Sequence, residues 1–470
     1  MKTIKGIPPL FWLGAVVVLA AAAALLLLLA PSGLRLTAIS PAAGDADVPI
    51  TAPLRLGFSG DVDPADVEAR LLVEPETAGR LEVEGRQVTF WPHSAWQPDR
   101  TYTVTLRAGV ATPSGHSLDE DRIWSFRTRN PQLLYLGRPA PALTGDEVRQ
   151  LFVATPDVAG GGSAGRQLTD HPGGVWDYAV HPQGEAIVYS VLREDGGSDL
   201  WRMDRDGDDQ RLLLACPDMA CLNPAWSPDG DLIAYERRDI WADAPNLDPQ
   251  AGRLWLLDLE EDSQRSLFDY DVPLHAPLWA PQGQRLAYLS PLGGGVEVLD
   301  LVSDETFPFA NEWGAMPSWS PDGRQLALSE LMLAGEAYVV RLVRVDVEGG
   351  ELLDISGEDE MVQDVAPAWS PGGSWIAFAR QFLDEERWTP GRQIWLTRPD
   401  GSEAYPLLEE PMADHFALAW RPDGASLAYV RNDLSEGAQP VPDVQVRVFD
   451  LVQRERVLVA TDAVRPGWLP

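Results

Sequence analysis

The side chains of this sequence that could bind a ligand recur at one place, just before the first strand of a repeated unit. Carboxylate, imidazole, amide, guanidinium and indole groups there could hold a ligand by hydrogen bonds, charge and stacking. If the first strands line a channel, these positions gather around one of its mouths, although each is also compatible with an ordinary loop. The candidate binding residues are Asn223, His275, Trp313, Asp364, Asp414, His415 and Arg465.

Two patterns suggest catalysis or metal binding, but both fit turns better. Residues 161–165 (Gly-Gly-Ser-Ala-Gly) have the spacing of a serine nucleophile, which needs a strand before it and a helix after it. We predict a glycine-rich hairpin tip instead. Residues 204–209 resemble the start of a calcium loop, but the glutamate required at the twelfth position is Ala215. We predict a turn with at most opportunistic calcium, and no catalytic residue, metal site or cofactor.

Cys216 and Cys221 are the two cysteines of the chain. They lie in a predicted loop between two repeats. In an oxidising compartment such a pair is a candidate for a small-loop disulfide, with two free thiols as the alternative. The six histidines do not show metal-ligand spacing.

A Trp-Ser-Pro-Asp-Gly motif and its variants recur after residue 130. The motif prolines follow one another at intervals of 40 to 53 residues, the period of four-stranded propeller blades. Proline presets the second position of a type I turn, and glycine at the fourth can take a positive φ. The tryptophan is expected to fill the wedge between blades. The motif tryptophans are Trp226, Trp279, Trp319, Trp369, Trp420 and Trp468.

The last residues repeat only the first half of this motif. The segment after residue 130 begins with apolar runs that match the second, third and fourth strands of a repeat, at residues 133–136, 150–153 and 166–169. We therefore predict that residues 464–470 supply the missing first strand. One blade is then built from both ends of the segment, which leaves no open sheet edge.

The motif, followed by Ile-Ala-Tyr at residues 233–235, resembles the WD40-like β-propeller repeats of the TolB family, over residues 131–470. The TolB propeller has six blades, whereas the repeats here predict seven, so a six-bladed ring is the alternative. Such repeats also occur in the propeller domains of some peptidases, which carry a separate hydrolase domain.

Residues 34–129 alternate apolar and polar positions like the strands of a β-sandwich. The segment is similar to bacterial Ig-like domains in its Ser-Pro-Ala-Ala-Gly start at residues 40–44 and its Trp-Ser-Phe-Arg-Thr end at residues 124–128. Such a module would act as a spacer. The expected fold class is all-β: a propeller plus an Ig-like β-sandwich, with one N-terminal transmembrane helix.

Residues 10–30 form an uncharged run long enough to span a bilayer. Lys2 and Lys5 precede it, so residues 1–9 are predicted to be a cytoplasmic tail and the rest extracytoplasmic. A cleaved signal peptide is the alternative. Because no cysteine follows the run directly, a lipid anchor is not expected. The net charge of −34 argues against nucleic-acid binding, which needs clustered lysine and arginine.

These observations predict a membrane-anchored, non-catalytic, monomeric scaffold that binds a protein, a peptide or a cell-envelope glycan. The alternative is a hydrolase or lyase that acts on a polysaccharide or peptide at the channel mouth, because a fold does not decide a function.

Overall fold

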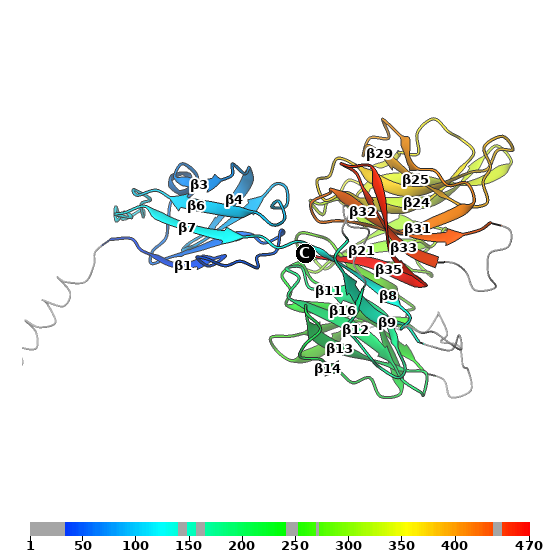
Figure 1. Cartoon of the computed structure of the whole chain (residues 1–470), viewed down its shortest axis with the longest axis horizontal. Helices are drawn as coiled ribbons and strands as arrows, with labels where there is room; N and C mark the ends of the chain where they lie inside the picture. Colours follow the sequence, from blue (N-terminus) through cyan, green and yellow to red (C-terminus); the bar gives the residue numbers. More distant parts are fainter. Residues whose placement is uncertain (1–32, 140–147, 157–164, 241–251, 269–271, 436–443) are drawn as a thin grey trace, which may run out of the picture. The chain divides into compact units, whose positions relative to one another are not determined.

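The computed structural model describes residues 33–139, 148–156, 165–240, 252–268, 272–435 and 444–470 (Figure 1). The chain divides into two compact units, each described here by itself. One comprises residues up to 45, 53–92 and 101–126, and the other comprises residues 46–52, 93–100 and 127–470. The predicted membrane segment, residues 10–30, lies outside the described residues. Within the described ranges, no helix has the length and apolar character needed to cross a membrane.

The first unit is built from two antiparallel sheets whose strands alternate buried and exposed side chains. The sheet orders are β1-β2-β5-β4 and β3-β6-β7. Its core includes Leu54, Val88 and Phe126. The elements are β1 (Leu36–Ser40), β2 (Leu54–Phe58), the short helix α2 (Pro64–Glu68), β3 (Leu71–Glu74), β4 (Gly79–Glu84), β5 (Gln87–Pro92), β6 (Thr101–Leu106) and β7 (Arg122–Arg127).

Two stretches inside the predicted 34–129 segment group with the second unit, and they bind each other. The Trp96 indole donates to the Ala52 carbonyl over 2.7 Å, and the Trp96 amide donates to the Ile50 carbonyl over 2.8 Å. Trp96 is buried. This tryptophan therefore explains why residues 46–52 and 93–100 belong together.

In the second unit, the last strand of the chain completes the sheet that begins after residue 130. The order is β10-β9-β8-β35, and β35 lies antiparallel to β8, with Trp468 opposite Leu133 and Val464 opposite Leu136 (Figure 1). The predicted closure between the two ends of the segment is therefore present. The strands are β8 (Gln132–Gly137), β9 (Gln150–Ala154), β10 (Arg166–Gln167) and β35 (Ala463–Leu469).

The remaining strands follow the same plan, in consecutive antiparallel sets of four, each of which we call a blade. Single parallel bridges, Ser198 to Ala220 and Val340 to Gln363, join two pairs of neighbouring blades into larger sheets. Residues 131–470 thus form a β-propeller. The strands are β11 (Val175–Val180), β12 (Ala186–Leu192), β13 (Ser198–Asp204), β14 (Arg211–Leu214); β15 (Met219–Trp226), β16 (Leu232–Asp239), β17 (Gly252–Asp258), β18 (Ser263–Ser266); β19 (His275–Trp279), β20 (Arg285–Ser290), β21 (Gly295–Asp300), β22 (Glu305–Ala310); β23 (Ser318–Trp319), β24 (Gln325–Ala334), β25 (Ala337–Asp346), β26 (Leu352–Asp354); β27 (Val362–Trp369), β28 (Ile376–Phe382), β29 (Gln393–Thr397), β30 (Tyr405–Leu408); and β31 (Ala413–Trp420), β32 (Ser426–Asp433), β33 (Val444–Asp450), β34 (Glu455–Thr461).

The motif tryptophans link neighbouring blades by a repeated hydrogen bond. An indole N–H donates to the backbone carbonyl of the preceding blade's first strand, and four of the six tryptophans are buried. Trp369 differs, because its indole donates to Gly373 in its own turn. The inter-blade pairs are Trp226 to Ala179 at 3.3 Å, Trp279 to Ala225 at 3.1 Å, Trp319 to Leu278 at 3.1 Å, Trp420 to Ala368 at 2.9 Å and Trp468 to Ala419 at 3.0 Å.

The motif turn has the predicted geometry. The Gly230 amide donates to the Ser227 carbonyl over 3.0 Å, and Gly230 has a φ of 85°. Glycine reaches this left-handed region without the steric cost that a Cβ brings. The Ser227 hydroxyl also accepts the Leu232 amide at 2.9 Å, which fixes the start of the next strand.

Five first strands contain a bulge three residues before the motif tryptophan. A non-glycine residue there has a φ of about 50°, and the strand register shifts across it. In four of these strands the next residue is a proline, which the bulge tolerates because no ladder hydrogen bond is needed there. The left-handed residues are Asn223, Ala276, Ala366, Ala417 and Arg465.

Candidate functional site

A chain of polar side chains crosses the first strands of neighbouring blades beside the closing blade. The Arg465 guanidinium lies 3.6 Å from the Asp177 carboxylate, which accepts the Asn223 amide at 2.5 Å. The Asn223 side chain in turn donates to Glu236 over 2.9 Å, and Glu236 lies 2.8 Å from Nδ1 of His275. Three of the predicted candidates, Asn223, His275 and Arg465, therefore belong to one network.

The bulges help to build this network. At a left-handed residue the backbone N–H leaves the strand ladder, and in two blades it reaches a carboxylate of the preceding blade. The Asn223 amide contacts Asp177, and the Ala276 amide donates to Glu236 over 3.4 Å. The backbone geometry of the repeat thus supplies two donors to this network.

The pKa values of the two buried carboxylates, Asp177 and Glu236, are shifted in opposite directions. Burial raises the pKa of Asp177, and the charge of nearby Arg465 opposes this shift. Burial would also raise the pKa of Glu236, but hydrogen bonds from His275 and Arg238 and the charge of these two residues lower it to about 2. Glu236 is therefore firmly ionised at neutral pH, whereas Asp177 is poised closer to protonation.

A pocket of about 550 Å³ opens at this network. It lies between the closing blade and the blade of β11, with Asn223 and Arg238 contributed by the next blade. Trp176, half exposed, is one of the lining residues. Its apolar lining consists of Leu136, Val148, Val175, Leu192 and Val464, and its cationic lining consists of Arg138, Arg149, Arg238 and Arg465.

Two of these arginines share one carboxylate. Arg138 lies 3.2 Å and Arg149 3.6 Å from Asp462. The Nε atoms of Arg138 and Arg149 are buried and, within the part of the chain that is described, have no hydrogen-bond partner. Asp462 is thus the ion-pair partner that both guanidinium groups share among the described residues.

Four other candidates lie outside this pocket. Asp364 forms a buried ion pair with Arg380, and Trp313 is exposed in the loop between β22 and β23. Asp414 accepts the Arg392 amide over 2.9 Å. His415 is buried with Nδ1 2.7 Å from the Arg392 carbonyl, and burial lowers its pKa. The sequence-based set is therefore divided by the structure, and only Asn223 and Arg465 line the pocket itself.

Several residues of the site carry no signal that the sequence analysis used. Arg138 and Arg149 follow and precede strands of the closing blade. Glu236 and Arg238 lie at the end of a second strand, just after the apolar Ile-Ala-Tyr run. A signal for the last two exists in retrospect: polar residues continue this second strand past its apolar core. Their register partners on the first strand are apolar, since Leu222 lies opposite Glu236 and Ala220 opposite Arg238.

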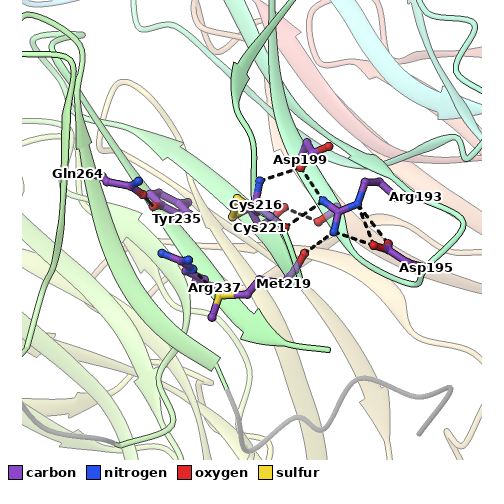
Figure 2. The surroundings of a disulfide bond; sticks show 10 residues. Arg193, Asp195, Asp199, Cys216, Met219, Cys221, Tyr235, Arg237 and Gln264 are labelled. Atoms are coloured by element: carbon purple, nitrogen blue, oxygen red, sulfur yellow. Dashed lines mark hydrogen bonds and ion pairs between the residues drawn. A yellow bond between two sulfur atoms is a disulfide. The ribbon is translucent and has the colours of Figure 1, made fainter. Parts of the chain in front are cut away.

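Cys216, which follows β14, forms a disulfide with Cys221, which lies within β15 rather than in the predicted loop, and the Cα–Cα distance is 6.2 Å. Figure 2 shows Arg193 beside it. The guanidinium contacts Asp199 and donates to the carbonyls of Cys216 and Met219 over 3.0 and 3.1 Å. This small loop is thus tied to the neighbouring hairpin.

The remaining sequence patterns are turns or lie outside the described residues. Residues 204–209 form the turn between β13 and β14, where the Asp204 amide donates to the Asp208 carbonyl over 2.9 Å. Most of the 161–165 pattern lies outside the described residues. Among the residues that are described, no cluster of three or more histidine, cysteine or acidic side chains could hold a metal ion.

Comparison with known proteins assigns the first part of the chain. Residues 31–128 match the family of bacterial Ig-like domains. This segment is a bacterial Ig-like domain. The match agrees with the two-sheet structure and with the resemblance of residues 40–44 and 124–128, and the Ig-like domain precedes the propeller in the sequence.

The chain is similar to several known proteins at low identity. The uncharacterized peptidase YuxL of Bacillus subtilis is 26% identical over 164 residues, 35% of this chain and 22% of that protein, so the chain spans about a fifth of its length. TolB from Acinetobacter baumannii is 12% identical with a TM-score of 0.43, covering 92% of this chain and 88% of TolB. The β-propeller domain of the Trilobed protease from Pyrococcus furiosus is 15% identical with a TM-score of 0.45, covering 61% and 84%.

Proposed function

We propose that this chain is an extracytoplasmic, membrane-anchored propeller that binds a protein or peptide at its channel mouth and does not transform it. The arginine-rich pocket beside the closing blade carries the proposal. It combines a polar network, apolar walls and a half-exposed tryptophan, the mixture that ligand pockets use for affinity and orientation. Residues 10–30 are the proposed anchor, with Lys2 and Lys5 on the cytoplasmic side.

We also propose that the ring has seven blades. The pairing of the described strands in fours supports this count, as does the closing blade shared by β35 and β8. The repeated indole-to-carbonyl contacts between successive blades support it as well.

The protonation states at the pocket favour binding over catalysis. A general base works best with a pKa near the operating pH, and the pKa of Glu236 is about 2 because His275 and Arg238 hold its charged form. His275 and Arg238 both occupy the Glu236 carboxylate, so this group is not available as a base. Glu236 is therefore a structural anion that orients Asn223 and His275.

One observation favours the second candidate, a hydrolase or lyase. Burial raises the pKa of Asp177 toward the range of a proton-transfer group, and Arg465 beside it could stabilise developing negative charge. If this candidate is right, wild-type protein cleaves a peptide or a cell-envelope polysaccharide and Asp177→Asn abolishes the cleavage. No cleavage by either protein removes this candidate.

Capture from membranes tests the binding function. The full chain, solubilised in detergent and carrying a photo-crosslinking residue in place of Trp176, is irradiated in its native membrane extract. We expect a discrete crosslinked protein that is lost with Arg465→Glu. The matched control is Arg211→Glu, because Arg211 is similarly exposed but lies on β14. Equal crosslinking in both variants contradicts the proposal, and enrichment of glycan alone identifies a different ligand class.

A further inference from the structure

The geometry points to a carboxylate-binding pocket: Arg138, Arg149 and Arg465 receive the carboxylate of a ligand whose neighbouring group is apolar. This inference rests on the proposed binding function and names the chemistry of the ligand at the same site.

The local charge is opposite to that of the protein. The chain carries a net charge of −34, yet four arginines line this one pocket. Among the described residues, the carboxylates paired with these arginines are those of Asp462, Asp177 and Glu236, so the described part of the site has one more positive than negative formal charge. A single carboxylate on the ligand would complete the balance, whereas a dianion would exceed it.

The donors are also incompletely used. Arg465 lies 3.6 Å from Asp177, and its side chain is 47% exposed. Arg149 lies 3.6 Å from Asp462, a separation beyond a good hydrogen bond. The guanidinium fork matches a carboxylate with two parallel N–H bonds. These arginines can therefore offer such bonds to a ligand without breaking a tight internal pair.

The rest of the pocket indicates what adjoins the carboxylate. Val148, Val175 and Val464 lie among the arginines, and Trp176 is 50% exposed. The valine side chains have no hydrogen bonds to offer a polar ligand, and Trp176 has only its indole N–H, but all four can bury apolar surface. A peptide that ends in an apolar residue has this chemistry, and so does a small branched carboxylic acid.

The test measures binding to the full chain in detergent, by calorimetry and by the change in tryptophan fluorescence. The probes are N-acetyl-Ala-Leu with a free carboxylate, its C-terminal amide, 4-methylpentanoate and inorganic phosphate. We expect the peptide acid to bind and the amide to bind at least about tenfold more weakly, because a hydrogen bond to a charged group contributes about this much or more. Equal binding of 4-methylpentanoate and the peptide acid supports the same carboxylate chemistry and identifies a small acid as a sufficient ligand.

The variants locate the binding. Arg465→Gln and Arg149→Gln should each weaken binding of the peptide acid by about 10- to 100-fold. Arg211→Gln should leave this affinity unchanged. Trp176→Phe should remove most of the fluorescence change and keep the calorimetric signal. Circular dichroism detects a variant that fails to fold. If one of the two arginine variants does not fold, the affinity of the other one tests the inference.

Three results overturn the inference: equal binding of acid and amide, tighter binding of phosphate than of the acid, or unchanged affinity in both arginine variants. If no probe binds but photo-crosslinking still depends on Arg465, the carboxylate inference is wrong and the proposed binding function stands. If the probes bind as expected but no partner is crosslinked, the proposed protein-binding function is wrong instead.

Discussion

Asp177 and Asp364 occupy first strands of two different blades, and each faces an arginine, but their surroundings differ. Arg380 forms two hydrogen bonds of 2.7 Å to Asp364, and both side chains are almost fully buried. Arg465 instead lies 3.6 Å from Asp177 and is half exposed. The same pair of residue types is thus a closed structural contact in one blade and an open, partly used one in the other.

Further contacts explain the difference. The Arg380 guanidinium also lies 3.2 Å from Asp359 and packs against the Phe378 and Trp395 rings at 5.1 and 4.7 Å. Within the described residues, the Arg465 guanidinium has one further hydrogen-bond partner, the Trp176 carbonyl, at 3.2 Å. An ion pair enclosed on all sides stabilises one arrangement, whereas an ion pair at a pocket can rearrange around a ligand.

The largest expected effect on stability follows from breaking the ion pair between Asp364 and Arg380. Arg380→Ala should lower the free energy of unfolding by about 3–5 kcal/mol, because it leaves the Asp364 carboxylate buried without its partner. Urea denaturation followed by fluorescence measures this. The double variant Asp364→Leu with Arg380→Met should cost less than Arg380→Met alone. If the double variant costs more, the pair is not the closed contact described here.

The second largest expected effect on stability concerns the closing blade, where the two ends of the propeller segment meet. Trp468→Ala should cost about 3 kcal/mol, because it removes a large side chain and the indole bond to Ala419 at the junction of the two chain ends. Trp388, which is exposed, serves as the control, and Trp388→Ala should change stability by less than about 0.5 kcal/mol. Similar urea midpoints for both variants would mean that the closing blade contributes little to the ring.

Acid should weaken the polar network that joins Asp177, Asn223, Glu236 and His275. The folded-state pKa of Glu236 is lowered from 4.5 to about 2, so its contribution is complete above pH about 4.5 and is lost as the pH falls toward 2. The shift corresponds to at most about 3 kcal/mol. Stability measured between pH 5 and 2.5 should fall less steeply in Glu236→Gln than in wild type, while Glu260→Gln, at an exposed turn, should follow wild type. Parallel curves for all three proteins would contradict the role of Glu236.

The smallest expected effect on stability is that of substituting Arg465, in contrast to Arg380. Arg465→Gln should change the free energy of unfolding by less than about 1 kcal/mol, because the Arg465 side chain is 47% exposed and its pairing with the buried Asp177, at 3.6 Å, is screened by water. Thermal melts compare it with Arg211→Gln. A loss as large as that of Arg380→Ala would show that Arg465 is structural and would remove it from the binding site.

Much of the fold was predictable because the repeat is encoded locally. The turn residues at 227–230 and the tryptophan before them specify each corner and each blade contact, and the half-motif at residues 468–470 indicated the closure that β35 and β8 form. In four of the five first strands with a bulge, a proline directly follows the left-handed residue. Asn223 and Arg465 were found from their phase in the repeat, which predicted them just before first strands, whereas the structure places them within β15 and β35.

The same reasoning could not separate Asp364 from the open site. Repeat phase gives the strand and the end of the strand, but not which side chain on the next strand reaches across. Arg380 is the register partner of Asp364 and covers it, whereas Ser190 is the register partner of Asp177 and brings no charge. The pairing of charges depends on residues that vary from blade to blade.

Sequence by itself therefore determined the repeating unit, its turns and the need for the two ends of the propeller segment to meet, since these depend on neighbouring residues and a fixed period. Only the tertiary structure decided that Arg465 lies at one pocket with Arg138 and Arg149. More than 300 residues of sequence separate them. The ring brings them together because backbone hydrogen bonds between β35 and β8 join the two ends, and nothing in the local sequence of the three arginines records that contact.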